Sequence, residues 1–325
     1  MSIENNENQS DEPEINKDLI NRLVFSSLNE QRRTRRWSIF FKFLTFALLF
    51  GYLAVFMAAL SKNDGMSNLS SGPHTALIDI QGVISSTTQA NADNIITGLR
   101  DAFENKNTKG IILRINSPGG SPVQSGYIND EIIRLRKKYK DILVYAVIVD
   151  VCASGGYYIA SAADKIYADK ASIVGSIGVL MNGFGFVDAM KKVGVQRRLY
   201  TAGENKGFLD PFTPEKQSDK KHIQKMLTSI HKQFIDVVKK GRGDRLKESP
   251  NLFSGYVWTG EESVAMGLVD GLGSSSYVAR EIIGAKDIVD FTPKPSYLDQ
   301  FAKQLGASFG TSISAVLGLD KVELR

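Results

Sequence analysis

Apolar residues along the 325-residue chain form one long run near the amino terminus and a series of short runs after it. The long run extends from Ile39 to Leu60 and carries a single charged residue, Lys42. At about 1.5 Å per helical residue it is about 33 Å long, which is enough to cross a bilayer core of about 30 Å. We therefore predict one transmembrane helix over residues 37–61.

Charged residues flank this run unequally. Four arginines precede it closely, namely Arg32, Arg33, Arg35 and Arg36. Only Lys62 and Asp64 follow it before the next apolar segment. Because basic residues mark the cytoplasmic end of a membrane helix, we expect residues 1–36, a polar tail with one short helix, in the cytoplasm and the rest of the chain outside. A cleaved signal peptide is the alternative, but the run is longer than such a segment and lacks a small-x-small cleavage site.

Beyond a linker over residues 62–73 that is rich in glycine, serine and asparagine, short apolar runs alternate with segments of helical periodicity. The predicted strands cover residues 75–84, 109–116 and 141–150, and the predicted helices cover 91–105 and 122–139. Apolar strands that lack alternation and are separated by helices are typical of a parallel sheet covered on both faces. The predicted fold class is therefore α/β, in one domain over residues 74–290. The tail over residues 291–325 has no assigned role.

The second half of this domain continues the pattern more loosely. A long helix is predicted to begin with Thr213 as its cap and Pro214 at its first position. His222 and His231 lie on this helix nine residues apart, about 180° around its axis, so they face opposite sides and are expected at the surface among lysines. His74 lies beside the linker. The chain thus offers no good histidine base for catalysis.

Composition limits other kinds of chemistry. One cysteine excludes an intramolecular disulfide and a cysteine cluster for a metal, and three scattered histidines leave little for a zinc site. We expect neither a metal nor a cofactor. The net charge of +5 comes in part from the arginines beside the membrane helix, so it does not indicate a nucleic acid partner.

Three glycine-rich turns, NSPGGSP, CASGGYY and VGSIGV, each follow a predicted strand. Because the carboxyl ends of parallel strands share one edge of the sheet, these turns are expected to meet at one cleft. Ser154 begins a short helix there, where unpaired N–H groups and the positive end of the helix dipole lie. Gly119 or Gly120, together with Gly155, can offer backbone N–H groups to a developing oxyanion. Tight turns without catalytic function are the alternative.

A serine nucleophile needs a base, and lysine is the remaining type where histidine is absent. Burial must then lower the lysine pKa from about 10.4 toward about 7. Most lysines of the chain stand in charged runs, whereas Lys206 has Gly203, Gly207 and Phe208 near it, and these neighbours favour desolvation. Cys152 is chemically the sharper nucleophile, but its place at the end of a strand indicates a buried structural residue.

The segments RINSPGGSP, ASGGYYIASAADKIYADKASIVGSIGV and TAGENKGFLDPF resemble the signal peptide peptidase A (protease IV) family of membrane-anchored serine peptidases. The likeness runs from about Thr75 to Ile283. It implies a spiral of βαβ units similar to Clp protease and crotonase. It also implies that Ser154 is the nucleophile, Lys206 the general base and Ser176 the residue that orients the lysine, with the glycines of SPGG and Gly155 as oxyanion donors.

The resemblance further implies a homo-oligomeric ring, an octamer being one form of it, in which the serine and the lysine of one site come from neighbouring subunits. We expect an endopeptidase at the outer face of the bacterial inner membrane that acts on signal-peptide remnants and other apolar peptides. Two alternatives stay open, a crotonase-type acyl-CoA enzyme with the same oxyanion geometry and a non-catalytic membrane scaffold that binds peptides. The outside location disfavours the first, because CoA is cytoplasmic.

The predicted orientation is testable with alkaline phosphatase, which becomes active only outside the cytoplasm. We expect a fusion after Gly72 to be active in bacterial cells, because the arginines before the membrane helix hold the amino terminus in the cytoplasm. A fusion after Glu30, which precedes the membrane helix, is the control and is expected to be inactive. An inactive fusion after Gly72 would contradict the orientation.

Overall fold

A computed structural model of the chain describes residues 12–62, 72–247 and 249–294. The chain divides into two compact units, Met1–Ser67 and Asn68–Arg325. The predictions made for residues 1–11, for most of the linker and for the tail beyond residue 294 lie outside the described residues.

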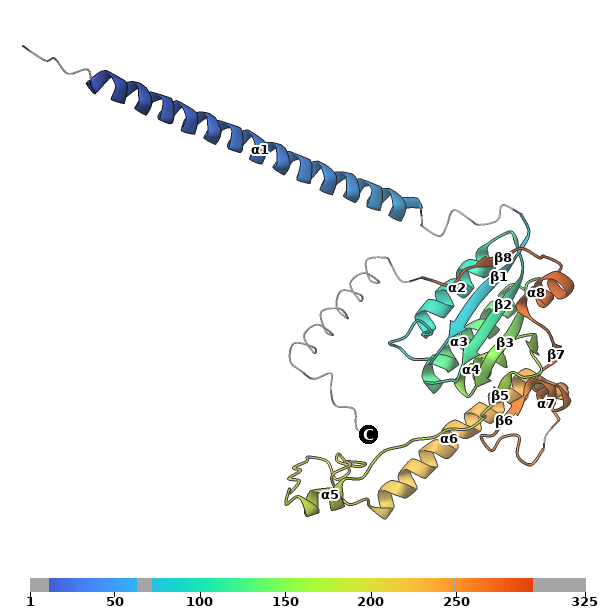
Figure 1. Cartoon of the computed structure of the whole chain (residues 1–325). Coiled ribbons are helices and arrows are strands. Elements are labelled where there is room, and N and C mark those ends of the chain that lie inside the picture. The colour runs from blue at the N-terminus through green and yellow to red at the C-terminus, as the bar shows by residue number, and fades with distance from the viewer. Residues whose placement is uncertain (1–11, 63–71, 248, 295–325) are drawn as a thin grey trace, which may run out of the picture. The chain divides into compact units, whose positions relative to one another are not determined.

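The described part of the first unit is one helix, α1 (Glu12–Lys62) (Figure 1). The short helix expected before the membrane segment is therefore continuous with that segment. The stretch from Arg32 to Phe56 is long and apolar enough to cross a membrane. Its large apolar side chains are exposed, Phe43 to 75%, so this helix has the properties expected of a membrane anchor.

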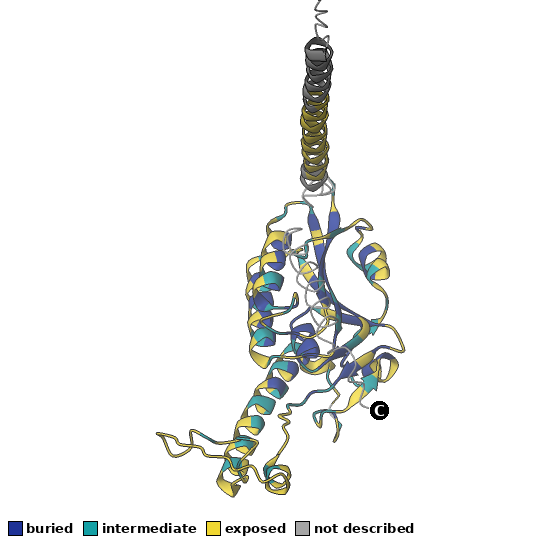
Figure 2. Cartoon of the chain, turned by 60° about the vertical axis from the view of Figure 1, so that its left-hand side comes forward, coloured by how far each residue is buried: buried dark blue, intermediate teal, exposed yellow. Residues whose placement is uncertain are grey.

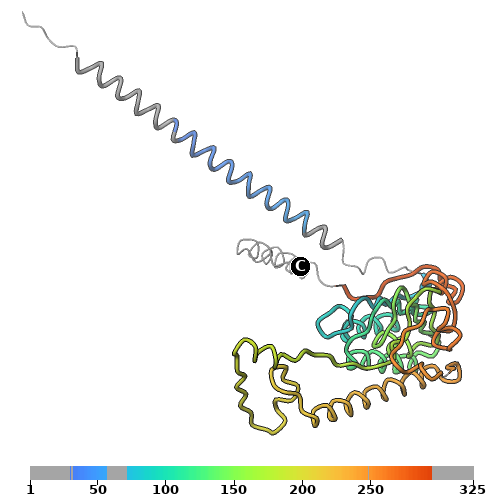
Figure 3. The backbone as a smooth tube through the Cα atoms, turned by 60° about the horizontal axis from the view of Figure 1, so that its bottom comes forward, coloured from blue at the N-terminus to red at the C-terminus, as the bar shows by residue number. Residues whose placement is uncertain are grey.

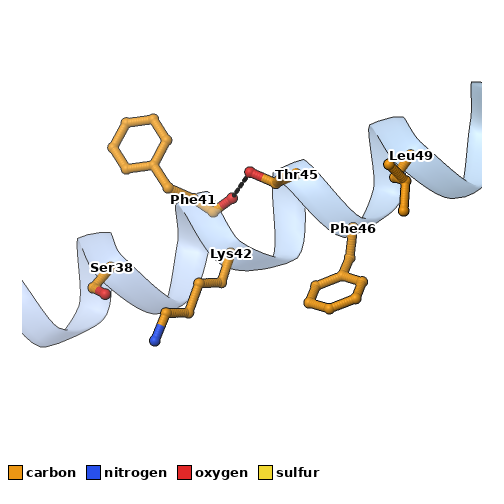
Figure 4. A pocket seen from close by; sticks show the side chains of 6 residues that line it. All are labelled: Ser38, Phe41, Lys42, Thr45, Phe46 and Leu49. Atoms are coloured by element: carbon orange, nitrogen blue, oxygen red, sulfur yellow. Dashed lines mark hydrogen bonds between the residues drawn. The ribbon is translucent and has the colours of Figure 1, made fainter. Parts of the chain in front are cut away.

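Polar side chains within the apolar part of α1 line a shallow groove, which Figure 4 shows with Ser38, Lys42 and Thr45 among its residues. The Thr45 hydroxyl donates to the carbonyl of Phe41 at 2.8 Å, a bond that satisfies the hydroxyl within the helix itself. The Lys42 side chain extends along the helix toward Ser38 (Figure 4). This direction leads to the arginine-rich end, so the amine can reach the membrane surface while the carbon chain stays in apolar surroundings.

The second unit is built on a mostly parallel sheet (Figure 1). Its strands are β1 (His74–Gln81), β2 (Thr108–Ser117), β3 (Leu143–Ala153), β4 (Lys165–Ala168), β5 (Ile173–Gly175), β6 (Val257–Thr259), β7 (Gly271–Leu272) and β8 (Ile288–Asp290). They follow the order β6-β5-β3-β2-β1-β8, with β4 paired to β3 and β7 paired to β4 off this path. The pairing of β5 with β6 is antiparallel, and the other pairings are parallel. The predicted α/β fold is confirmed.

Helices cover both faces of this sheet (Figure 2). They are α2 (Ala92–Glu104), α3 (Pro122–Lys138), α4 (Gly155–Ala160), α5 (Val187–Lys192), α6 (Gln217–Arg242), η1 (Gly243–Arg245), α7 (Gly260–Ala265), α8 (Ser275–Tyr277) and η2 (Val278–Ile283). One face, which includes Ile78 and Leu113, packs against residues of α2, α3 and α6 in the main core. The other face, which includes Ile112 and Val147, packs against η2 in a smaller core. The central strands are therefore buried on both sides, as their continuous apolar runs predict.

Local sequence explains where the first helices begin. Asn91 caps α2 by accepting a hydrogen bond from the N–H of Asn94. Ser121 caps α3 directly before Pro122, whose fixed φ suits the first helical position. The strands and helices predicted for the first half of the domain agree with the observed ones to within a few residues.

One local prediction is wrong. The helix α6 begins at Gln217 and not after Thr213, because the N–H and the hydroxyl of Thr213 both donate to the Asp210 carbonyl in a separate turn. His74 is the first residue of β1 and is fully buried. Its ring stacks on Phe291 with 5.8 Å between centroids, because β8 lies next to β1 and the chain continues from β8 along the same edge.

The segment after β5 extends away from the sheet together with the first part of α6 (Figures 1 and 3). We call residues 180–233 the distal arm. No residue from Leu180 to Gln233 is buried. The arm is held by local contacts such as the stacked rings of Phe186 and Phe212, whose centroids are 5.5 Å apart. Burial within one copy of the chain thus does little to offset the entropy lost when this segment is ordered.

Substitution of alanine for glycine is expected to have opposite effects on stability at two positions within helices. A Cβ at Gly241 in α6 would lie 2.0 Å from the carbonyl oxygen of Ser161, whereas a Cβ at Gly126 in α3 would have nothing within 4 Å. We expect Gly241→Ala to lower the free energy of unfolding by about 2 kcal/mol or more, because α6 must move away from Ser161. We expect Gly126→Ala to raise it by about 0.5–1 kcal/mol through helix propensity.

Thermal unfolding of the detergent-solubilised chain, followed by circular dichroism, measures both effects. Wild-type protein and Gly126→Ala serve as the references for Gly241→Ala. Equal midpoints for the two variants would show that α6 does not approach Ser161 this closely.

Candidate active site

The carboxyl ends of β2, β3 and β5 meet at one edge of the sheet. Ser117 pairs with Cys152 across β2 and β3, and Ala153 pairs with Gly175 across β3 and β5. The backbone N–H of Ser154 donates to the Gly175 carbonyl at 2.8 Å. The three glycine-rich turns, which are far apart in the sequence, therefore lie side by side.

A cavity of about 650 Å³ opens at this edge. Its lining includes four of the residues singled out in the sequence, Ser154, Ser176, Gly120 and Gly155. The helices α4 and α6 add Tyr158, Ile230, His231, Gln233 and Phe234. This volume is typical of small-molecule and peptide side-chain sites, and the lining combines apolar rings with convergent polar groups.

Ser154 has an unusual backbone conformation, with φ of 51° and ψ of −121°. Residues other than glycine rarely adopt positive φ, and such a conformation costs about 1–3 kcal/mol. Ser154 stands at the N-cap position of α4, but its hydroxyl makes no capping hydrogen bond to a helix N–H. A sharp strand-to-helix turn of this kind presents the nucleophile in α/β-hydrolases. The geometry here suits Ser154 to the same task.

The turn after β2 packs directly against Ser154. A Cβ at Gly119 would lie 2.7 Å from both the Ser154 Cβ and the Gly155 nitrogen, so the contact requires glycine. The Gly119 N–H donates to the Ser117 hydroxyl at 3.1 Å and is therefore engaged. The backbone N–H groups of Gly120 and Gly155 are placed differently from that of Gly119. Gly155 is the first residue of α4, where N–H groups lack helical acceptors, and Gly120 lines the cavity beside it.

An isolated parallel β-bridge pairs Gly120 with Ile84, and its hydrogen bonds explain the orientation of the Gly120 amide. The hydrogen bonds of this bridge are made by the neighbours of Gly120, since Ile84 N–H donates to the Gly119 carbonyl and Ser121 N–H donates to the Ile84 carbonyl. In a parallel ladder the residue between two bonded neighbours directs its own N–H to the other side. Gly120 and Gly155 are thus better placed than Gly119 to donate to an oxyanion.

Ser176 is the second serine of the cavity and the second non-glycine residue there with positive φ, at 49°. Its N–H donates to the Tyr256 carbonyl at 2.8 Å, which joins the turn after β5 to the residue before β6. The side chain is half-buried. The structure therefore brings Ser176 into the same cavity as Ser154.

Lys206 lies elsewhere in the single chain. It belongs to a turn of the distal arm, where its N–H donates to the Gly203 carbonyl at 3.1 Å, and its side chain is exposed. Phe208, which the sequence suggested as a desolvating neighbour, is itself 42% exposed and packs its ring against His222. Lys206 is not among the residues that line the cavity around Ser154. One copy of the chain therefore neither buries this lysine nor brings it to the serine.

His231 is the cavity residue that the sequence analysis missed. It was expected at the surface, but it is half-buried and lines the cavity, and its Nε2 lies 3.1 Å from the Ile177 carbonyl oxygen. The sequence does contain a signal, because Ile230 and Phe234, four residues apart on either side of His231, are apolar and lie on one face of a helix. His222, nine residues earlier on α6, is exposed as expected.

Cys152 lies in β3, two residues before Ser154, and is fully buried in the main core. Burial in apolar surroundings raises the pKa of its thiol above the ordinary range. A thiol without access to its thiolate form is a poor nucleophile. The interpretation of Cys152 as a structural residue agrees with this position.

Comparison with known proteins identifies the relatives of the chain. Residues 135–288 match the model of peptidase family S49, a range that includes Ser154, Ser176 and Lys206. The chain is 31% identical over 234 residues to a putative protease of Methanocaldococcus jannaschii, a match that covers 70% of this chain and 74% of that one. It is 32% identical over 223 residues to a putative signal peptide peptidase SppA of Enterococcus faecium, covering 66% of this chain and 64% of that one.

A longer protein of Brucella abortus, named Na(+)/H(+) antiporter NhaA, is 47% identical over 188 residues. This match covers 58% of the present chain but 25% of the Brucella protein. The chain thus spans a quarter of that relative and just under two thirds of the Enterococcus one. The antiporter name describes a protein most of which lies outside the match.

The burial of Cys152 predicts its reactivity toward a thiol reagent such as DTNB. We expect the folded chain to react at least about 100-fold more slowly than the chain unfolded in guanidinium at the same pH, because the buried thiol is neither accessible nor ionised. Absorbance of the released thiolate measures both rates. The unfolded chain is the internal control, and a folded chain that reacts at the unfolded rate would contradict the burial.

Proposed function

Because the chain belongs to peptidase family S49, the signal peptide peptidase A family, we propose that it is an endopeptidase with a serine/lysine dyad. Membership of the family supports the peptidase class. The assignment of Ser154 as nucleophile is carried by its strained backbone at the cavity, which it lines together with Gly120 and Gly155. The assignment of Lys206 as general base rests on the resemblance to the family. A strained residue at a cavity mouth is the kind of feature that function retains.

The proposed reaction begins when the Ser154 Oγ attacks the carbonyl carbon of a peptide bond and passes its proton to the Lys206 amine. The oxyanion that forms accepts hydrogen bonds from the N–H groups of Gly120 and Gly155. The C–N bond then breaks, and the lysine returns the proton to the leaving amine. Water attacks the remaining acyl-enzyme with the same lysine as base, which frees Ser154.

Ser176 and Gly119 have supporting roles in this proposal. The Ser176 hydroxyl accepts a hydrogen bond from the lysine amine or donates one to it, and so orients the amine toward Ser154. Gly119, named in the sequence as a possible oxyanion donor, acts instead through its missing side chain, which lets the turn after β2 approach Ser154. Its N–H is already bound to Ser117.

We propose that Lys206 reaches Ser154 from a neighbouring copy of the chain. A lysine acts as a base near neutral pH only when burial lowers its pKa, and the distal arm contains no buried residue. The arm exposes large apolar side chains, among them Leu180 to 80%, Phe184 to 82% and Tyr200 to 89%. Contact with a second copy would cover these apolar side chains and desolvate Lys206 at the same time. A homo-oligomeric ring, such as an octamer, provides one such contact for every site.

The proposed substrates are apolar peptides such as signal-peptide remnants at the outer face of the bacterial inner membrane. The apolar rings of Tyr158 and Phe234, whose centroids are 5.1 Å apart, together with Ile230, supply a lining for apolar side chains. The helix α1 carries the membrane candidate, and the arginines before it favour an outward-facing peptidase unit. Peptides released within the bilayer would thus be produced in the membrane to which the peptidase unit is anchored.

A mixing experiment tests the dyad and its division between copies. Ser154→Ala and Lys206→Ala are each expected to lower turnover of a fluorogenic apolar peptide by more than about 1,000-fold, since each removes one member of the pair. Co-expression of the two variants in equal amounts is expected to restore about one quarter of the wild-type turnover. A quarter of randomly paired neighbours combine an intact serine with an intact lysine.

Two further variants and three outcomes make the test decisive. Lys206→Arg is expected to be as inactive as Lys206→Ala, because arginine stays protonated, whereas Lys192→Ala, also exposed in the arm, serves as the active control. Wild-type turnover in either single variant would refute the dyad. If both single variants are inactive and their co-expression restores no turnover, the proposal that two copies share one site is refuted. A purified wild-type protein without turnover on any peptide favours the membrane scaffold.

A further inference from the structure

The turn that follows β5 needs external support. Gly175 has φ of 112° and Ser176 has φ of 49°. A serine persists in this region of backbone space only where its neighbours hold it. On one side the support is the hydrogen bond from the Ser176 N–H to the Tyr256 carbonyl, and the Gly175 carbonyl accepts from Ser154. The next residue, Ile177, is held from α6.

His231 supplies this support from α6. Its Nε2 lies 3.1 Å from the Ile177 carbonyl oxygen, and since a carbonyl only accepts, Nε2 is the donor. The ring is half-buried, whereas the Ile177 side chain is fully buried. Phe234, one turn further along α6, is buried in the main core and fixes this part of the helix. The histidine therefore connects a rigid helix to the backbone of the turn.

We infer that His231 is a positioning residue, whose Nε2–H holds the Ile177 carbonyl and thereby sets the position of Ser176 relative to Ser154. The inference rests on the proposed function, in which Ser176 orients the lysine. The same bond extends its effect to Gly178 and Val179, which follow Ile177 and line the cavity. Because Nε2 is committed to the carbonyl, His231 does not offer this nitrogen as a base to Ser154.

The donor persists when the ring is protonated. Both ring nitrogens carry hydrogen in the imidazolium form, and in the neutral form the bond to Ile177 requires the Nε2–H tautomer. His231 thus holds the turn in either charge state. This behaviour separates a positioning histidine from a general base, which must lose its proton to act.

The test compares two substitutions in the full chain, purified in detergent, with a fluorogenic apolar peptide as substrate. His231→Phe keeps a ring but loses the donor, and we expect kcat to fall about tenfold with KM within about twofold of wild type. His231→Gln keeps an N–H at a similar reach, and we expect kcat within about threefold of wild type. Lys232→Gln alters the next, exposed residue and is expected to leave both constants unchanged.

Three kinetic outcomes would overturn the inference. They are an unchanged kcat in His231→Phe, a change confined to KM, which indicates substrate contact, and equal losses in the Phe and Gln variants. Ser154→Ala is measured alongside to separate this inference from the proposed function. If Ser154→Ala is inactive while His231→Phe matches wild type, only the inference fails. If Ser154→Ala retains turnover, the proposed function fails first.

A second measurement observes the His231 ring in the wild-type chain itself and uses a variant only to assign its signal. The chain has three histidines, so ¹⁵N labelling of histidine gives few ring signals, and His231→Gln or a second conservative variant, His231→Asn, assigns the one of interest. We expect the neutral form of His231 to be protonated at Nε2 in the wild-type chain. A ring protonated at Nδ1 has no donor for Ile177 and would overturn the inference.

Discussion

One backbone hydrogen bond, from the Ser154 N–H to the Gly175 carbonyl at 2.8 Å, fixes the edge of the sheet that carries Ser154 and Ser176. It joins the end of β3 to the end of β5 where the chain turns into α4, and Ser154 has φ of 51° there. The turn after β2 packs against this corner only because Gly119 has no Cβ. The cores on both faces of the sheet supply the stability that offsets this strain, so the rigid interior and the strained edge depend on each other.

The distal arm follows a different physical rule from the sheet. Around the sheet, continuous apolar strands are covered by helices of the same chain, and this burial accounts for the order of the domain. In the arm, from Leu180 to Gln233, no side chain is buried. The ring contacts of Phe186 with Phe212 and of Phe208 with His222 are local and at the surface. The arm is therefore the part of this unit that burial within the chain stabilises least.

The contrast explains what the sequence predicts. Strands such as β2 and β3 follow from apolar runs, and Ser154 and its glycines follow from turns at strand ends, because these signals are local. The start of α6 was misplaced because a turn at Asp210 takes the hydrogen-bonding groups of Thr213. His231 was missed because its partner, Ile177, is distant in the sequence. In the proposed dyad, Lys206 is desolvated by another copy of the chain, and such surroundings cannot be predicted from the sequence of one copy.

The exposed position of Lys206 has a consequence for the life of the protein before assembly. With the proposed dyad, a newly made copy carries both halves of a catalytic pair but cannot bring them together by itself. No inhibitory segment is then required to keep it silent. Under this proposal, copies anchored in one membrane would gain activity when they meet, so the onset of proteolysis would report the lateral density of the enzyme and rise more steeply than its amount.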